Sequence, residues 1–229
     1  MIYKTEQTAS TNTAIREGGF CHLDVVAASV QTQGRGRGEK KFVSNVGGLY
    51  MSMLIDCAAV YGDIGGYITP LAGCAVSELL LGYGFDPKIK WVNDVFVGGK
   101  KICGILAERF QRDGRGYIAV GIGLNVNNAD FGEYSAIATS MSIEAKKSFD
   151  LNAVLSELTE RLIFMIGNRG KNEIIDEYRR LSLVVGKYAA LEDGTRVFVR
   201  GIDGDGRLEA VMPDGQDAVI SSGSITPLL

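Results

Sequence analysis

Residues 23–30 (LDVVAASV) run directly into residues 31–41 (QTQGRGRGEKK), and together they predict a strand followed by a polar loop. The first part is apolar and rich in β-branched side chains, which predicts a buried strand. In the second part glycines let the backbone approach a ligand closely, while arginines between them offer forked donors that match carboxylates and phosphates. The glycines are Gly34, Gly36 and Gly38, and the arginines are Arg35 and Arg37.

We therefore predict a strand, an anion-binding loop and a second strand, to which Lys40 and Lys41 add positive charge. A solvated basic hairpin tip is the alternative interpretation. The loop differs from a Walker loop, because the Gly-Lys-Ser/Thr ending and the helix that follows it are both missing.

The rest of the chain reads as mixed helix and strand. Apolar patterning predicts strands at 49–55, 89–92, 95–97, 102–107 and 117–124, and helices at 13–17, 71–81, 151–166 and 173–181. Thr69 is expected to be the N-cap of the second helix, with Pro70 at its first position. After residue 184, closely spaced Asp-Gly turn pairs predict about five short strands and a small closed or half-closed barrel. We expect two domains, 1–184 and 185–229.

Composition excludes several classes of protein. The 229 residues are 46% hydrophobic and carry a net charge of −3, so we expect a packed core and no DNA as a partner. No stretch has the roughly 20 apolar residues of a membrane span, and residues 1–10 lack a signal-peptide core. The four scattered cysteines predict reduced thiols and a cytoplasmic location. Because His22 is the sole histidine, imidazole chemistry is not expected.

Three further polar motifs accompany the loop. They are Ser10-Thr11-Asn12, the run from Lys90 to Asp94 (KWVND) with Lys101 beyond a Gly-Gly turn, and residues 121–127 (GIGLNVN). A lysine, an amide and a carboxylate at a strand end would suit a nucleotide and its magnesium ion. Each motif also has an ordinary structural interpretation, as a helix N-cap, an Asn-Asp turn or a strand end.

Taken together and in this order, the four motifs resemble those of biotin–protein ligases. The resemblance covers nearly the whole chain. It implies an α+β fold, with a catalytic domain built on a central mixed β-sheet flanked by helices, as in class II synthetases and lipoate ligases, followed by a small SH3-like β-barrel. It also implies an enzyme, a ligase that joins biotin to ATP as biotinyl-5′-AMP and passes biotin to one lysine of a biotin carboxyl carrier protein. Biotin and ATP would be its substrates, with Mg²⁺ as the metal.

The resemblance also assigns roles to residues. Lys101 and Arg37 would be catalytic, with Lys101 stabilising charge at the junction of carboxylate and phosphate. Biotin would be bound by Ser10, Thr11, Asn12, Gln31, Arg35, Gly36, Arg37, Lys101 and Gly104. ATP would be bound by Arg37, Lys40, Phe42, Asn93, Asp94 and Asn125, and Asp94 would hold the magnesium ion.

Departures from the family pattern fall at three places. In the loop, Glu39 replaces a glycine, Lys40 an arginine, and Phe42 the tryptophan that would cover adenine. We predict weaker retention of the adenylate, since lysine lacks the bidentate fork of arginine. Val92 stands where the family usually has proline, and the Ser222-Gly223-Ser224 tail lacks the usual glutamate.

Alternatives stay open. A lipoate–protein ligase or another acyl–protein ligase would use the same two-step chemistry, and a non-catalytic biotin sensor would bind without transferring. The first motif begins at Ser10, so we expect a short form without an N-terminal DNA-binding domain. The sequence leaves monomer and homodimer equally open.

Overall fold

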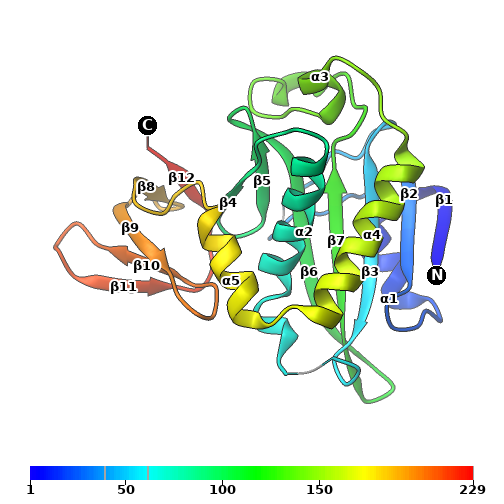
Figure 1. Ribbon diagram of the computed structural model, residues 1–229, viewed down its shortest axis with the longest axis horizontal. Coiled ribbons are helices and arrows are strands. Elements are labelled where there is room, and N and C mark those ends of the chain that lie inside the picture. Colours follow the sequence, from blue (N-terminus) through cyan, green and yellow to red (C-terminus); the bar gives the residue numbers. More distant parts are fainter. Residues whose placement is uncertain (39, 61, 229) are drawn as a thin grey trace.

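The computed structural model describes residues 1–38, 40–60 and 62–228, which form a seven-stranded sheet and a separate five-stranded sheet (Figure 1). The first sheet has the strand order β1-β2-β3-β7-β6-β5-β4. Its strands are β1 (Ile2–Thr8), β2 (Val25–Gln31), β3 (Leu49–Asp56), β4 (Lys88–Lys90), β5 (Asp94–Val97), β6 (Lys100–Arg112) and β7 (Arg115–Leu124). β1 pairs in parallel with β2 and the other pairs are antiparallel, so the expected central mixed sheet is confirmed.

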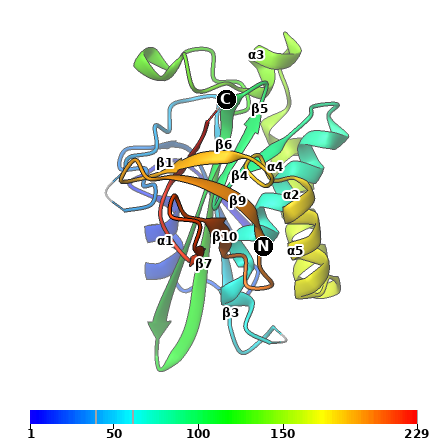
Figure 2. The same cartoon turned by 90° about the vertical axis from the view of Figure 1, so that its left-hand side faces the viewer.

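Helices cover the two faces of this sheet unequally. On one face lie α2 (Ile68–Gly82), α4 (Leu151–Asn168) and α5 (Lys171–Arg180), which enclose the main hydrophobic core. On the other face α1 (Thr11–Glu17) packs on β2, β3 and β7, where a smaller apolar cluster surrounds Ile15. Figure 2 shows α1 and the larger helical layer on opposite sides of the sheet. Because α1 is short, it covers only part of this face of the sheet, and polar residues lie on the rest.

Short elements complete the chain. They are the 3₁₀ helices η1 (Ile64–Gly66) and η2 (Gly132–Tyr134) and the helix α3 (Met141–Ala145). None of the helices in the described ranges is both long enough and apolar enough to span a membrane.

The second sheet is antiparallel, with the order β11-β10-β9-β8-β12. Its strands are β8 (Tyr188–Leu191), β9 (Arg196–Ile202), β10 (Leu208–Val211), β11 (Asp217–Ile220) and β12 (Ile225–Pro227). The buried Trp91 joins the two sheets, because its indole Nε1 donates a hydrogen bond of 2.9 Å to the carbonyl oxygen of Gly206. The next peptide bond, between Trp91 and Val92, is cis.

Two sequence-based predictions of local structure are wrong, and one strand was not predicted. α2 begins at Ile68 with Tyr67 as its N-cap, so Thr69 and Pro70 are its second and third residues. Tyr67 is also the C-cap of η1, so one helix leads directly into the next and Thr69 has no chain end to cap. β4 ends at Lys90, where residues 91–93 form a turn, and the edge strand β1 was not predicted.

Candidate active site

A strip of small residues crosses the α1 face of the sheet and forms the floor of the candidate site. Gly121 of β7 pairs with Ser52 of β3, and Gly123 of β7 pairs with Gly104 of β6. A Cβ atom at Gly121 would lie 2.5 Å from Asn12 Oδ1. One at Gly123 would lie 2.4 Å from the ring of Phe42. The glycines are therefore needed because polar and aromatic groups rest directly on the backbone here.

The Ser10-Thr11-Asn12 motif forms the start of α1, with Ser10 as an N-cap whose side chain makes no capping hydrogen bond. Thr11 donates its backbone N–H to Gln31 Oε1 at 2.8 Å. Ser52 Oγ lies 2.8 Å from Thr11 Oγ1 and 2.6 Å from Asn12 Oδ1. We call Thr11, Asn12, Gln31 and Ser52 the polar clamp. The resemblance assigned three of these residues, Thr11, Asn12 and Gln31, to biotin, and the structure brings them together with Ser52.

The carboxylate of Glu108, on β6, is the negative group beside this clamp. It accepts a hydrogen bond from Asn12 Nδ2 at 2.8 Å, and Arg35 Nη2 lies 3.2 Å from each of its oxygens. Arg16 Nη1 is 3.5 Å away. One carboxylate thus connects α1, the Gly/Arg loop and the sheet.

The Gly/Arg loop, residues 31–44, folds back on itself and also reaches the second sheet. Gly36 donates its N–H to the carbonyl oxygen of Lys40, and Phe42 donates to that of Gly34. Arg37 Nη1 donates to the carbonyl oxygen of Gly223 at 3.0 Å. Lys40 Nζ lies 3.1 Å from Ser224 Oγ and 3.6 Å from Glu192. Glu39 lies outside the described residues.

Phe42 covers the glycine floor. Its ring contacts the backbone at Gly104 and Gly123, and Lys101 Nζ lies 5.6 Å from the ring centroid. A cation at this distance from an aromatic face is attracted to it. Phe42, Lys101 and Gly104, which were assigned to two different substrates, therefore form one contiguous surface.

Lys101 projects onto the same face because β6 is irregular near its start. The register with β5 shifts between Val95 and Phe96, and Lys101 Nζ comes to lie 3.2 Å from a Cβ atom built on Gly104. Lys101 Nζ forms an ion pair with Asp94 Oδ1 at 2.7 Å. Lys90 Nζ is 3.9 Å from the other oxygen of Asp94.

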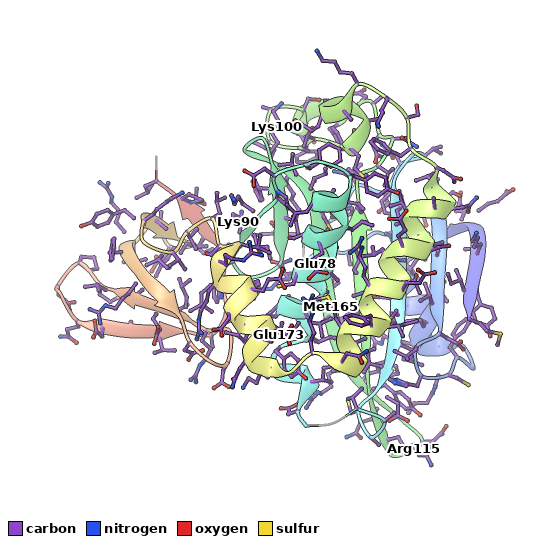
Figure 3. All side chains as sticks on the ribbon, in the orientation of Figure 1. Glu78, Lys90, Lys100, Arg115, Met165 and Glu173 are labelled. Carbon is purple, nitrogen blue, oxygen red and sulfur yellow. The ribbon has the colours of Figure 1, made fainter. Side chains whose placement is uncertain are left out.

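Lys90 lies between the helical layer and the second sheet (Figure 3). Burial lowers the pKa of its ammonium group, the charges of Lys101 and Lys40 lower it further, and Asp94 opposes the shift. The pair of lysines around one carboxylate leaves this corner with a surplus of positive charge, which suits a phosphate or carboxylate ligand.

The asparagines predicted to serve ATP hold the backbone in this structure. Asn93 Nδ2 donates to the carbonyl oxygen of Ile105, and Asn125 Nδ2 donates to that of Thr139, each at 2.9 Å. Asn93 directly precedes Asp94, and Asn125 donates its backbone N–H to the carbonyl oxygen of Ile102, the residue after Lys101.

Sequence reasoning missed Ser52 and Glu108. Ser52 is fully buried in an otherwise apolar run, and Glu108 follows one. The signal available in the sequence was a polar side chain in or beside an apolar strand, because a buried polar group requires a hydrogen-bond partner.

The chain resembles known proteins over most of its length. The family model described as "Biotin/lipoate A/B protein ligase family" matches residues 3–127. A biotin–[acetyl-CoA-carboxylase] ligase of Mycobacterium tuberculosis is 31% identical over 97% of this chain and 87% of its own. The bifunctional ligase/repressor BirA of Bacillus spizizenii is also 31% identical, but this chain covers 62% of it.

The fold also resembles that of a solved biotin protein ligase. The biotin protein ligase of Aquifex aeolicus in complex with biotin and ATP superposes with a TM-score of 0.84 and 26% identity, covering 99% of this chain and 98% of its own. With the clamp, the glycine floor and the positive corner in one place, and with relatives matched over nearly the full sequence, this chain belongs to the biotin/lipoate A/B protein ligase family.

Proposed function

We propose that this chain is a biotin–protein ligase, which activates biotin with ATP and transfers it to a lysine of a biotin carboxyl carrier protein. The observation that carries the proposal is the polar clamp beside the Lys101–Asp94–Lys90 corner. Biotin has a ring with urea N–H and C=O groups at one end and a carboxylate at the other. The clamp suits the first end and the lysines suit the second.

In the first step a carboxylate oxygen of biotin attacks the α-phosphorus of ATP. A P–O bond forms, the bond to pyrophosphate breaks, and biotinyl-5′-AMP results. Two anions have to meet, so preorganised positive charge is the main requirement of this step. Lys101 stands at the proposed junction, and Arg35 and Arg37 lie on the loop above the floor.

In the second step the neutral amine of the acceptor lysine attacks the acyl carbon, and AMP leaves. The nucleophile comes from the partner protein, so the chain needs no serine or cysteine of its own. Burial raises the pKa of the Cys103 thiol, which keeps it protonated and unsuited to attack. A loop that covers the mixed anhydride would protect it from water.

The residues present do not fit a magnesium ion bound by protein ligands alone. Asp94 is already paired with two ammonium groups. No group of three or more His, Cys, Asp or Glu side chains in the described ranges could hold a metal. Any magnesium in the proposed reaction would arrive on the phosphate oxygens of ATP. The assignment of Asp94 to magnesium stays a prediction that this geometry does not favour.

The remaining site assignments are part of the proposal. Ser10, Gly36 and Gly104 border the biotin site, while Lys40, Phe42, Asn93 and Asn125 border the ATP site. We also propose that residues 185–229 form a separate domain, which supports the Gly/Arg loop through Gly223 and Ser224. Whether two copies associate is a matter for gel filtration.

The test is ATP-dependent labelling of a carrier domain with biotin, together with biotin-dependent exchange of radioactive pyrophosphate into ATP. Exchange with biotin and transfer to the carrier support the proposal. Exchange with lipoate in place of biotin would identify the lipoate ligase instead. Binding of biotin without exchange or transfer would identify a sensor.

The altered loop should change how long the adenylate is held. We expect the double variant Glu39→Gly plus Lys40→Arg to slow adenylate dissociation, because arginine restores a bidentate donor and the loss of glutamate removes a negative charge. The dissociation rate of labelled biotinyl-5′-AMP measures this. An unchanged rate would show that these positions do not control retention.

A further inference from the structure

A hydrogen-bonded chain runs through the polar clamp and begins at a carboxylate. Glu108 Oε2 accepts from Asn12 Nδ2 at 2.8 Å, and Asn12 Oδ1 faces Ser52 Oγ at 2.6 Å. Ser52 Oγ is in turn 2.8 Å from Thr11 Oγ1. Asn12 is 3% exposed and Ser52 is 0% exposed, and buried polar groups of this kind require hydrogen-bond partners.

The other end of the chain is a backbone carbonyl of the Gly/Arg loop. Ser44 Oγ donates to the carbonyl oxygen of Phe42 at 3.1 Å and accepts from Gln31 Nε2 at 2.9 Å. Gln31 Oε1 accepts the backbone N–H of Thr11 at 2.8 Å. Both ends of the chain are therefore acceptors, which fixes the direction of the hydrogen bond next to each end.

The carboxylate fixes the orientation of Asn12. An ionised carboxylate accepts hydrogen bonds and donates none, so Asn12 must turn its NH₂ group toward Glu108 and its oxygen toward Ser52. The one hydroxyl proton of Ser52 is then committed to Asn12. The carbonyl oxygen of Leu106 also accepts from Asn12 Nδ2, at 3.2 Å, so the NH₂ group has two acceptors and its orientation is the same for both.

Thr11 is the residue on which the two halves converge. Its Oγ1 lies between Ser52 Oγ, whose proton points to Asn12, and Gln31 Oε1, which has no proton, at 3.1 Å. Thr11 can donate its own proton to one of them, but neither neighbour can donate to it. Its oxygen thus keeps unused acceptor capacity, which fits an N–H group of a ligand.

We propose that Glu108 and Ser52 are positioning residues that set the polarity of the clamp, so that it presents an acceptor to a ring N–H of the substrate. This inference rests on the proposed function, in which the substrate is a cyclic urea. Glu108 has a second part in it, because its oxygens also hold Arg35 of the loop at 3.2 Å. The state of the clamp and the position of the loop are thereby linked through one carboxylate.

The test uses Glu108→Leu, Glu108→Gln and Ser52→Ala, with two matched controls. Ser77 is also 0% exposed and lies on α2, and its hydroxyl has no hydrogen-bond partner among the residues that the structure describes, so Ser77→Ala controls for Ser52→Ala. Glu157, on α4, accepts from Tyr83 at 2.9 Å and controls for loss of a hydrogen-bonded carboxylate. Each variant is assayed by pyrophosphate exchange, with its melting temperature measured alongside.

The substrates are biotin and the isosteric cyclic carbamates in which one ring N–H is replaced by oxygen. A site built around an N–H should reject a carbamate strongly, because acceptor would face acceptor. We expect Glu108→Leu and Ser52→Ala to raise the KM for biotin about tenfold with a smaller change in kcat, and to reduce the preference for biotin over one carbamate about tenfold. Glu108→Gln keeps an acceptor oxygen and should recover part of that preference.

Equal losses on biotin and both carbamates, in step with a lower melting temperature, would assign the two residues a merely structural role and overturn the inference. An unchanged preference in both variants would overturn it as well. Assays of the wild-type chain distinguish failure of the proposed function from failure of this inference. If the wild-type chain does not exchange pyrophosphate with biotin at all, the proposed function fails, whereas normal exchange with unaltered variant preferences removes the polarity role alone.

Discussion

Replacing Gly121 with alanine tests how closely the clamp rests on the sheet. The new Cβ would lie 2.5 Å from Asn12 Oδ1, 3.0 Å from its Cγ and 3.1 Å from its Nδ2. Ordinary contact with a carbon atom needs about 3.5 Å, so the Asn12 side chain would have to move by roughly 1 Å. The hydrogen bonds of Asn12 to Ser52 and Glu108, now 2.6 and 2.8 Å, would then exceed normal length.

The structure sets the size of the effect. Buried polar groups that lose their partners cost about 1–3 kcal/mol, and replacing glycine in a strand returns about 0.5–1 kcal/mol. We expect a net loss of about 2 kcal/mol, which lowers the melting temperature by about 4–8 °C in a chain of this length. Because Asn12 belongs to the clamp, the KM for biotin should rise about tenfold.

Gly116→Ala is the matched control on the same strand. A Cβ there would meet Cys57 at 3.9 Å, which is an ordinary contact. Thermal unfolding and pyrophosphate exchange should find this variant within about 0.5 kcal/mol of wild type. If Gly121→Ala has the same melting temperature as Gly116→Ala and an unchanged KM for biotin, Asn12 does not rest on the backbone at Gly121.

Three further outcomes are expected. Lys101→Ala should sharply reduce adenylate formation, and normal pyrophosphate exchange in that variant would remove Lys101 from the proposed role. Burial, and then the nearby charge of Glu78, raises the pKa of Glu177, and Arg169 Nη1 lies 2.7 Å from its carboxylate. Arg169→Leu leaves this carboxylate without this partner, so the free energy of unfolding should fall by about 2 kcal/mol at pH 7. The pKa of Glu177 is raised, so the carboxyl group takes up a proton and loses its charge as the pH falls toward the ordinary pKa range of glutamate. Part of the lost stability should then return, and a melting temperature of the variant that is independent of pH would contradict this. Trp91→Phe removes the donor to Gly206 and should lower the melting temperature by a few degrees, about 1 kcal/mol, with no change expected if the two sheets do not depend on that bond.

The sequence predicted the internal elements of the sheet better than its margins. Residues 117–124 form a buried apolar run, and β7 occupies Arg115–Leu124 as that pattern indicates. β1 was missed because it lies at the sheet edge with most of its side chains exposed, which leaves no apolar alternation to detect. An edge strand is fixed by the backbone of its neighbour, here β2, and that pairing leaves no pattern in the side chains of β1.

The same contrast applies to the site. The Gly/Arg loop and the Ser10-Thr11-Asn12 motif carry their chemistry in consecutive residues, so sequence reasoning found them. Ser52 and Glu108 act through contacts with residues 40 and 96 positions away, at Asn12. Their roles depend on which face of the sheet each strand turns toward α1, and that is decided by register, not by composition.

The support of the Gly/Arg loop has a consequence for how the protein is made. A chain that emerges N-terminus first can pair β3, β6 and β7 soon after Leu124 appears. Arg37 still lacks its acceptor at that time, since Gly223 follows 186 residues after it. At ordinary rates of synthesis the delay from Leu124 to Gly223 is about 5–20 s. For that interval a nascent chain would have its floor and clamp in place under a loop that is tied to Glu108 but not yet to the second sheet.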